Sequence, residues 1–546
     1  MKELDVVQVI GRFGVYHGVV TLLACLRAFP VAWTNLMSPL MAADVKHWCA
    51  PPNSSIPRTW WRKHGLPRVN KWSLEPDGCS MYAWESQPNE EFGIRFDREQ
   101  LLSCTNGFEY DREGFGLTAT EEWQLICGDA WKTSAMQSII MAGSFVGVII
   151  FGRLSDKLGR KHTFFVGLAL LLSTGIAAAF VHSFITFNIL RFILAGATSG
   201  MTAALVTAFM EILPESDRIY MNIGFGIGYT VPVIFIPLLS YYLLNFRYMQ
   251  LAIGLSGLLI LPFFWVIHES PKWLVAKHRF TEAEQVIVKI LKMNRRPVPD
   301  MTEVMPKLAI HAESESTVKS RNLGFIDIMK IPILRYTALT TGLNWFCWSS
   351  ISYYCALNAH RLPGNPHLNF AISTFAEFPS AFIAMYLIRN CRRRQTQMFN
   401  IIVAACIFAA VFFLDDSYKL TKVWGNMIAR VFVNNYGFIV WVSVHEVYPT
   451  PVRTAGYASA MMLSRGGAAF APFIKNIGDW THTSVPCFII LGLCASIIGC
   501  VALLPETLNK KLPDTIDDVK ALYGRDGYIV AKYAKAVPTH IHSDCI

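Results

Sequence analysis

Charged residues are scarce in this sequence. Only 16% of the 546 residues are Asp, Glu, Lys or Arg, whereas soluble proteins carry roughly 25%. The glycines form no P-loop or dinucleotide-binding pattern, and the 13 cysteines show no zinc-site spacing. The composition excludes a soluble multidomain enzyme, and the missing motifs lead us to expect no metal, no cofactor and no catalytic site.

Long apolar runs take the place of the missing charge, because 53% of the residues are hydrophobic. About twelve runs approach the roughly 20 residues that a helix needs to cross a bilayer. They lie at 17–41, 133–152, 162–181, 186–210, 219–241, 248–267, 333–357, 368–388, 397–414, 421–445, 454–474 and 484–504. The first run is too long for a signal peptide core and lacks a convincing cleavage site, so we expect a permanent helix.

The orientation follows from the short loops that hold Lys and Arg, since such loops remain in the cytoplasm. The loop after the second run holds Arg153, Lys157, Arg160 and Lys161, and the loop after the eighth holds Arg389 and Arg392 to Arg394. Both loops lie an even number of crossings from the N-terminus. We therefore expect both termini in the cytoplasm of a multi-pass membrane protein, and we assign the net charge of +10 to this face rather than to nucleic acid.

This orientation divides the chain into six parts. We expect a cytoplasmic N-terminus with helix 1 (1–41), an extracellular loop (42–132), helices 2–6 (133–267), a cytoplasmic linker (268–332), a second six-helix half (333–504) and a cytoplasmic tail (505–546). In the linker, the pattern from Thr281 to Lys292 predicts an amphipathic helix. Pro297 and Pro299 predict a loop from Arg295 to Arg321.

The extracellular loop contains four cysteines, Cys49, Cys79, Cys104 and Cys127. An even number in an oxidising compartment predicts two disulfides, although four cysteines allow three connectivities. Asn53 begins an Asn-Ser-Ser glycosylation sequon in the same loop. These features indicate a glycoprotein of the plasma membrane.

The two halves repeat a signature at the end of their fourth helices. Glu211 is followed by Pro214 and Arg218, and Glu446 is followed by Pro449 and Arg453 at the same offsets. Like-oriented six-helix halves indicate a parallel repeat, with a substrate site between them near mid-membrane. Transport by alternating access is therefore the leading function, and we expect Glu211, Arg218, Glu446 and Arg453 to act in gating.

A ten-residue motif, Gly152 to Lys161, joins the second and third helices. Its glycines, Gly152 and Gly159, allow a tight turn, and Arg160 adds positive charge. With two helices close together at the inner surface, Asp156 can pair with a basic group or a helix end across their interface. Such a contact is expected to act as a latch that opens when the inner gate opens.

This motif resembles the loop motif of the major facilitator superfamily. Further segments resemble the organic cation, anion and zwitterion transporter family of solute carriers: Cys104 to Asp111, Glu122 to Cys127, Glu269 to Leu274, Glu446 to Thr450 and Leu504 to Thr507. The resemblance covers nearly the whole chain and implies a major facilitator fold with a large disulfide-bearing loop after helix 1. In the second copy of the loop motif, Asn390 stands where the family usually has an acid.

Two ionisable residues lie well inside apolar runs, Glu377 in the eighth and Arg465 in the eleventh. A charge at the bilayer centre costs roughly 3 kcal/mol or more and usually faces a cavity. The resemblance implies a cation-type acid at Glu377 and an anion-type base at Arg465, so a zwitterion such as a carnitine-like betaine or an amino-acid derivative would satisfy both. The alternative for either residue is a structural ion pair.

Aromatic residues in the fifth and seventh runs are candidates to hold a quaternary ammonium group by cation–π attraction. The remaining substrate-binding candidates are Tyr229, Asn344, Trp345, Tyr353 and Tyr354. The alternative for the aromatic side chains is packing against other helices or lipid. The predicted function is secondary transport of small organic ions, with zwitterions as the leading substrate class and with a coupling ion (Na⁺ or H⁺) or a counter-substrate left open. An organic anion or organic cation transporter and a non-transporting receptor or scaffold remain the alternatives.

Overall fold

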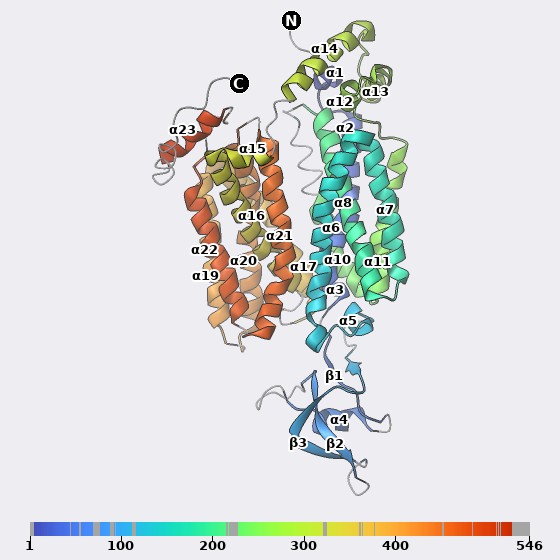
Figure 1. Cartoon of the computed structure of the whole chain (residues 1–546), viewed down its shortest axis with the longest axis vertical. Coiled ribbons are helices and arrows are strands. Elements are labelled where there is room, and N and C mark those ends of the chain that lie inside the picture. Colours follow the sequence, from blue (N-terminus) through green and yellow to red (C-terminus); the bar gives the residue numbers. More distant parts are fainter. Residues whose placement is uncertain are drawn as a thin grey trace.

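The structure is a computed structural model of the whole chain (Figure 1). It describes residues 5–526 except 44, 54–55, 69–76, 88–91, 93, 112–115, 215–216, 218–227, 320–324, 360–361, 363, 376, 416, 450–451, 483, 509, 511–512 and 514. Within the described residues, each of the twelve predicted apolar runs coincides with helix. Eight helices are long and apolar enough to cross a membrane by length and composition.

The first half of the bundle contains the predicted runs one to six. Its helices are α2 (Val15–Leu36), continued by the short α3 (Ser38–Met41), α6 (Trp131–Leu158), α7 (Arg160–Phe180), α8 (Phe184–Ile212), α10 (Gly228–Tyr242) and α11 (Phe246–Leu255). Two turns of 3₁₀-helix, Ser256–Leu259 and Leu261–Phe264, extend α11.

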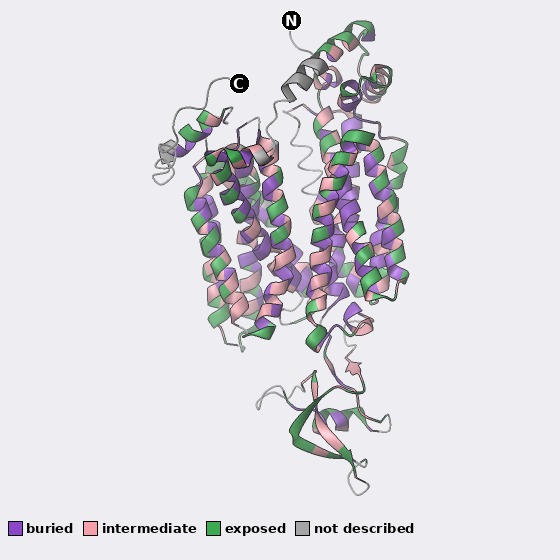
Figure 2. Ribbon diagram, viewed as in Figure 1, coloured by how far each residue is buried: buried purple, intermediate pink, exposed green. Residues whose placement is uncertain are grey.

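The second half contains runs seven to twelve. Its helices are α16 (Pro332–Asn358), α17 (Pro366–Phe375), α18 (Glu377–Asn390), α19 (Arg393–Phe413), α20 (Lys419–Val447), α21 (Arg453–Trp480) and α22 (Val485–Leu503). The two halves stand side by side (Figure 1), and α21 and α17 of the second half contact α6 and α10 of the first half. Buried residues follow the helix faces inside each half, and exposed residues follow the outer faces (Figure 2).

Small residues allow the helices of the first half to approach closely. A Cβ atom added to Gly147 of α6 would lie 2.3 Å from the Cα atom of Gly196 of α8. One added to Gly143, a turn earlier, would lie 2.3 Å from the carbonyl oxygen of Phe192. Small residues four apart are typical of helix contacts in membranes, where close packing drives association.

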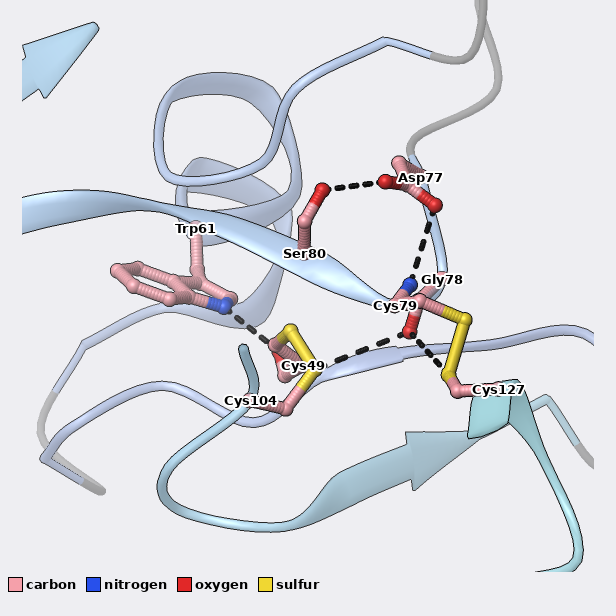
Figure 3. The surroundings of a disulfide bond; sticks show 8 residues. All are labelled: Cys49, Trp61, Asp77, Gly78, Cys79, Ser80, Cys104 and Cys127. Carbon is pink, nitrogen blue, oxygen red and sulfur yellow. Dashed lines mark hydrogen bonds between the residues drawn. A yellow bond between two sulfur atoms is a disulfide. The ribbon is translucent and has the colours of Figure 1, made fainter. Parts of the chain in front are cut away.

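The loop between α2 and α6 forms a small domain, residues 47–111, which we call the disulfide domain. It contains two antiparallel strand pairs, β1 (His47–Cys49) with β4 (Phe108–Tyr110) and β2 (Ser80–Ser86) with β3 (Ile94–Ser103), and helix α4 (Arg58–His64). Disulfides join Cys49 to Cys104 and Cys79 to Cys127 (Figure 3). The predicted two disulfides are confirmed, and the structure assigns their pairing.

The disulfide domain is attached to the first half of the bundle. Glu122, at the end of α5 (Ala119–Glu122), forms an ion pair with Arg247 of α11. Arg247 also donates to the carbonyl oxygens of Ala179 and Val181, at distances of 2.9 and 3.0 Å. Trp123 donates to the carbonyl oxygen of His182 at 2.7 Å. These contacts connect the disulfide domain to the ends of α7 and α11.

The opposite end of the bundle carries α1 (Val6–Ile10), α12 (Pro271–Ala276), α13 (Phe280–Met293), α14 (Met301–Lys319), α15 (Phe325–Lys330) and α23 (Ile516–Asp526), as Figure 1 shows. Helix α13 confirms the amphipathic helix predicted in the linker. The loop predicted from Arg295 to Arg321 is wrong, because α14 occupies most of it. Both prolines precede α14. The Asp300 carboxylate accepts a hydrogen bond from the amide of Thr302 at 3.0 Å, and this bond caps the first turn of α14.

Candidate substrate site and gating networks

The ten-residue motif lies where α6 meets α7, and it builds a charged network within the first half. Arg160 donates from Nη2 and Nε to Glu211 of α8 at 2.9 and 3.2 Å, and from Nη1 to Asp156 at 3.0 Å. The carboxylate of Glu269 accepts the amides of Arg160 and Lys161 at 2.6 and 3.0 Å. A carboxylate at this place stabilises the N-terminal end of α7.

The two glycines of the motif have different surroundings. Gly159 has a φ angle of +99°, which favours glycine, and a Cβ atom there would lie 2.3 Å from the Glu269 carboxylate. A Cβ atom on Gly152 would meet no heavy atom within 4 Å. Gly159 is therefore required for the turn, and the structure shows no close approach at Gly152.

The second half repeats this network. Glu506 accepts the amides of Arg393 and Arg394 at 2.9 and 3.1 Å, as Glu269 does in the first half. Arg393 contacts Glu446 of α20 only from Nη2, at 3.4 Å, and the second oxygen of Glu446 accepts the hydroxyl of Thr507. The sequence repeat is thus reproduced in atomic contacts, but the Arg–Glu pair of the second half is looser.

The hydrogen bonds correct the alignment of the second loop motif with the first, in which Asn390 was placed at the position of the acid. Arg160 donates from Nη1 to the carbonyl oxygen five residues before it, Ser155, and Arg393 donates to Ile388 at the same offset. This register places Arg389, and not Asn390, at the position of Asp156. The second half therefore has a base where the first has an acid.

The other proposed gating residues lie near these networks or outside the described residues. Arg453 donates to the carbonyl oxygens of Tyr448 and Pro513 at 3.3 and 3.4 Å. Arg218 is not among the residues that the structure describes. The side chain of Asp156 is 76% exposed and pairs with Arg160. Among the described residues, it forms no hydrogen bond or ion pair with the second half.

The two halves touch near the end that carries the disulfide domain. Ser134 of α6 donates to the carbonyl oxygen of Pro472 and to the side chain of Asn476 on α21, at 3.1 and 3.0 Å. Ser138, one turn further along α6, donates to the carbonyl oxygen of Ala469 at 2.6 Å. These bonds close the interface at this end, and Figure 1 shows the halves diverging toward α1 and α23.

Four of the seven substrate-binding candidates come together between the halves. Tyr229 of α10 is close enough to interact electrostatically with Tyr353, Glu377 and Arg465. Asn35 of α2 also influences the Tyr229 hydroxyl. One side chain from the first half is thus within electrostatic range of three from the second half.

Arg465 and Glu377 differ in their partners. Glu377 forms an ion pair with Arg430 of α20, whose guanidinium also donates to Ser373 of α17. Within the described part of the chain, Arg465 forms no hydrogen bond or ion pair, although Tyr229 and Tyr457 lie within its electrostatic influence. A partly buried arginine without an acid partner is suited to binding an anionic group.

The other three candidates pack within the second half. Trp345 is 1% exposed and lies edge-on to Trp348, with ring centroids 5.7 Å apart. Asn344 is buried and accepts the hydroxyl of Tyr436. Tyr354 packs against the hydrophobic core of this half. These positions match the packing alternative more closely than a role in the substrate site.

Four residues near this group are not among the candidates predicted from the sequence. Arg430 lies inside the tenth apolar run, but nothing in its spacing indicates that it pairs with Glu377. Nothing in the sequence distinguishes Asn35 or Tyr457 from other polar residues in the same runs. Arg27 of α2, 2% exposed, donates to the hydroxyl of Thr202 and interacts electrostatically with Tyr229.

Comparison with known proteins identifies the family. The family model described as "Sugar (and other) transporter" matches residues 93–516. The inward-open xylose transporter XylE from E. coli has a similar fold, with a TM-score of 0.59 and 13% identity over 93% of this chain and 99% of that one. The chain therefore belongs to the sugar (and other) transporter family of the major facilitator superfamily.

Several named transporters are similar to this chain over nearly their whole length. The organic cation transporter protein of Drosophila melanogaster is 30% identical over 528 residues, which cover 94% of each chain. Mouse solute carrier family 22 member 4 is 28% identical over 96% of each chain. Human organic cation/carnitine transporter 2 is 28% identical over 96% of this chain and 95% of its own. The chain is thus a multi-pass membrane transporter of small organic substrates, of the organic cation/carnitine type, and not an enzyme.

Proposed function

We propose that this transporter carries small zwitterions, such as carnitine-like betaines or amino-acid derivatives, across the plasma membrane by alternating access. The observation that carries the proposal is the position of Arg465. This arginine lies in a membrane helix, forms no hydrogen bond or ion pair with a described residue, and is within electrostatic reach of Tyr229 on the opposite half. A substrate carboxylate would supply the missing partner.

Arg465 would bind the anionic end of the substrate. A guanidinium binds both oxygens of a carboxylate at once, which fixes the orientation of the ligand as well as its charge. The interaction would be strong because the site lies between helices and away from bulk water. We therefore assign the carboxylate subsite to Arg465.

The cationic end would lie toward Glu377, Tyr229 and Tyr353. Glu377 carries the negative charge of this group, and its side chain is 26% exposed. The rings of Tyr229 and Tyr353 can attract a quaternary ammonium group through their faces. Charges of both signs near Tyr229 favour a zwitterion over an anion or a cation alone.

Alternating access would use the two charged networks as gates. We assign gating roles to Gly152, Asp156, Gly159, Arg160, Glu211, Arg218, Glu446 and Arg453, as the sequence predicts. In the conformation described here the halves meet near the disulfide domain, and Asp156 forms no hydrogen bond or ion pair with a described residue of the second half. A return movement that closes the other end would bring Asp156 toward the second half and engage the latch.

The proposed orientation places both termini in the cytoplasm and the disulfide domain outside the cell. Asn53 is exposed on this domain, as a glycosylation acceptor must be. The opposite end of the bundle carries the linker helices and the Arg-rich turn between α18 and α19, in agreement with a cytoplasmic face. Whether transport is coupled to Na⁺, H⁺ or a counter-substrate is a question for the uptake experiment described next.

Uptake by cells that express the chain tests the proposal. Carnitine, tetraethylammonium and a dicarboxylate are supplied as radiolabelled substrates, with and without Na⁺ and at two pH values. We expect carnitine to be the preferred substrate, and Arg465→Ala to reduce its uptake by well over tenfold, since losing such a contact costs roughly 2–5 kcal/mol. Arg465→Lys should recover part of the loss, because a lysine keeps the charge but not the two-pronged geometry.

The matched control is Lys475→Ala on the same helix, which removes a cation that pairs with Asp479 at 3.7 Å. It should leave the uptake of all three substrates nearly unchanged. Surface protein is measured by biotinylation in every variant. Equal loss of all three substrates in Arg465→Ala, with poor surface delivery, would assign Arg465 to helix packing and remove the carboxylate role.

A further inference from the structure

Arg430 is placed to influence the substrate site without contacting the substrate. It lies on α20, and its side chain is only 5% exposed. One amino group of its guanidinium donates to Ser373 on α17, and the other forms the ion pair with Oε1 of Glu377 on α18. A single buried arginine therefore holds together three segments of the second half and fixes the orientation of the Glu377 carboxylate.

The ion pair uses only part of Glu377. Among the described residues, Arg430 contacts Oε1, and no hydrogen bond to Oε2 is formed. The side chain of Glu377 is 26% exposed and interacts electrostatically with Tyr229. Glu377 can therefore still attract a cationic group, but its charge is largely balanced by Arg430.

This balance determines the net charge of the site. Glu377 contributes one negative charge, and Arg430 and Arg465 contribute two positive charges. A simple cation would meet a site with a net positive charge, whereas a zwitterion would bring a carboxylate to neutralise Arg465. Opposite charges a few ångströms apart, shielded from water, interact strongly enough for this difference to dominate selectivity.

We propose that Arg430 is a specificity-determining residue that acts through Glu377: it weakens the attraction of Glu377 for cations, so that the site discriminates against organic cations that lack a carboxylate. This inference rests on the proposed function, because it needs Arg465 as the carboxylate subsite. Arg430 is a positioning residue here, and it makes no direct contact with the substrate.

A double-mutant cycle tests the inference. Arg430→Gln removes the balancing charge and leaves Glu377 alone, so uptake of tetraethylammonium relative to a dicarboxylate should rise at least tenfold. Glu377→Gln leaves Arg430 unbalanced, so the same ratio should fall at least tenfold. The double variant removes both charges and should return the ratio to the wild-type value. Arg430→Lys keeps the charge and should leave the ratio within about threefold of wild type.

A merely structural ion pair predicts a different pattern. Each single variant would then lose uptake of both substrates in parallel, together with surface protein, and the ratio would not change. If Arg430→Gln does not reach the surface, the uptake ratio of Glu377→Gln is compared with that of the double variant. These two variants differ only at Arg430, and the double variant leaves no unpaired buried charge at this ion pair. Their comparison therefore still measures the effect of Arg430 on the ratio. An unchanged ratio in these two variants, or a raised ratio that persists in the double variant, overturns the inference.

The two proposals fail in different ways. Wild-type uptake with an unchanged ratio in the cycle overturns the role of Arg430 alone, while the effect of Arg465→Ala on carnitine stands. Absence of wild-type uptake of all three substrates, with normal surface protein, overturns the transport of these substrates and the role of Arg430 together.

Discussion

The two charged networks should contribute unequally to stability, and a pair of isosteric variants measures the difference. In the first half, the Arg160 guanidinium contacts Glu211 through both Nε and Nη2, at 2.9–3.2 Å, with side chains 10% and 16% exposed. In the second half, Arg393 reaches Glu446 only at 3.4 Å, with side chains 12% and 19% exposed. Burial is thus similar, and only the geometry differs.

The geometry sets the expected magnitudes. Removing one partner of a well-made buried ion pair costs roughly 3–5 kcal/mol, because the other charge is left unpaired. For Glu211→Gln we expect about 3 kcal/mol, since the amide keeps one acceptor, or a fall in Tm of ~6–12 °C for a half of this size. For Glu446→Gln we expect about 1 kcal/mol and ~2–4 °C, because its contact with Arg393 is long.

Thermal unfolding of the purified protein, followed by tryptophan fluorescence, measures both variants under the same conditions. Glu303→Gln serves as the control, since this carboxylate is 74% exposed on α14 and pairs with Lys307 at 3.7 Å. It should leave the Tm unchanged within about a degree. Equal shifts for Glu211→Gln and Glu446→Gln would refute the argument that contact geometry, and not the presence of the repeat, determines the stability of each network.

Two further outcomes follow from the disulfide domain and from the latch. Cys49→Ser or Cys104→Ser should reduce surface delivery, because this small domain depends on its disulfides and losing one typically costs roughly 2–5 kcal/mol; mass spectrometry that finds four free loop thiols in surface protein would contradict it. Asp156→Asn should leave Tm within ~2 °C of wild type, since the side chain is 76% exposed, yet reduce transport by slowing the conformational cycle. Wild-type turnover at equal surface expression would make Asp156 an ordinary loop charge.

The fold was predictable because its main signal is local. Each membrane helix needs about 20 apolar residues in a row, and the run at 186–210, for example, became α8 from Phe184 to Ile212. The linker helix α14 was missed for a local reason as well. Pro297 and Pro299 exclude helix at their own positions, but they do not prevent a helix that starts after them at Met301.

The candidate site was less predictable because its contacts join residues far apart in the chain. The sequence identified Glu377 and Arg465 as unusual charges, and the structure places both near Tyr229. It could not show that Glu377 pairs with Arg430, 53 residues later, while Arg465 has no such partner among the described residues. Burial and pairing together distinguish a charge that is already balanced from one that is available to a ligand.

The division of roles between the halves follows from these contacts. The second half supplies the charges of the candidate site, Glu377, Arg430 and Arg465, and the first half supplies Tyr229. The first half in turn has the tighter charged network and carries the disulfide domain through the Glu122–Arg247 pair. Under the proposed function, a substrate bound to charges of the second half would have to meet the uncharged Tyr229 of the first half for the two halves to close around it. Closure would therefore be sensitive to the size and shape of the ligand at Tyr229, whereas Arg465 and the Arg430–Glu377 pair would select its charge.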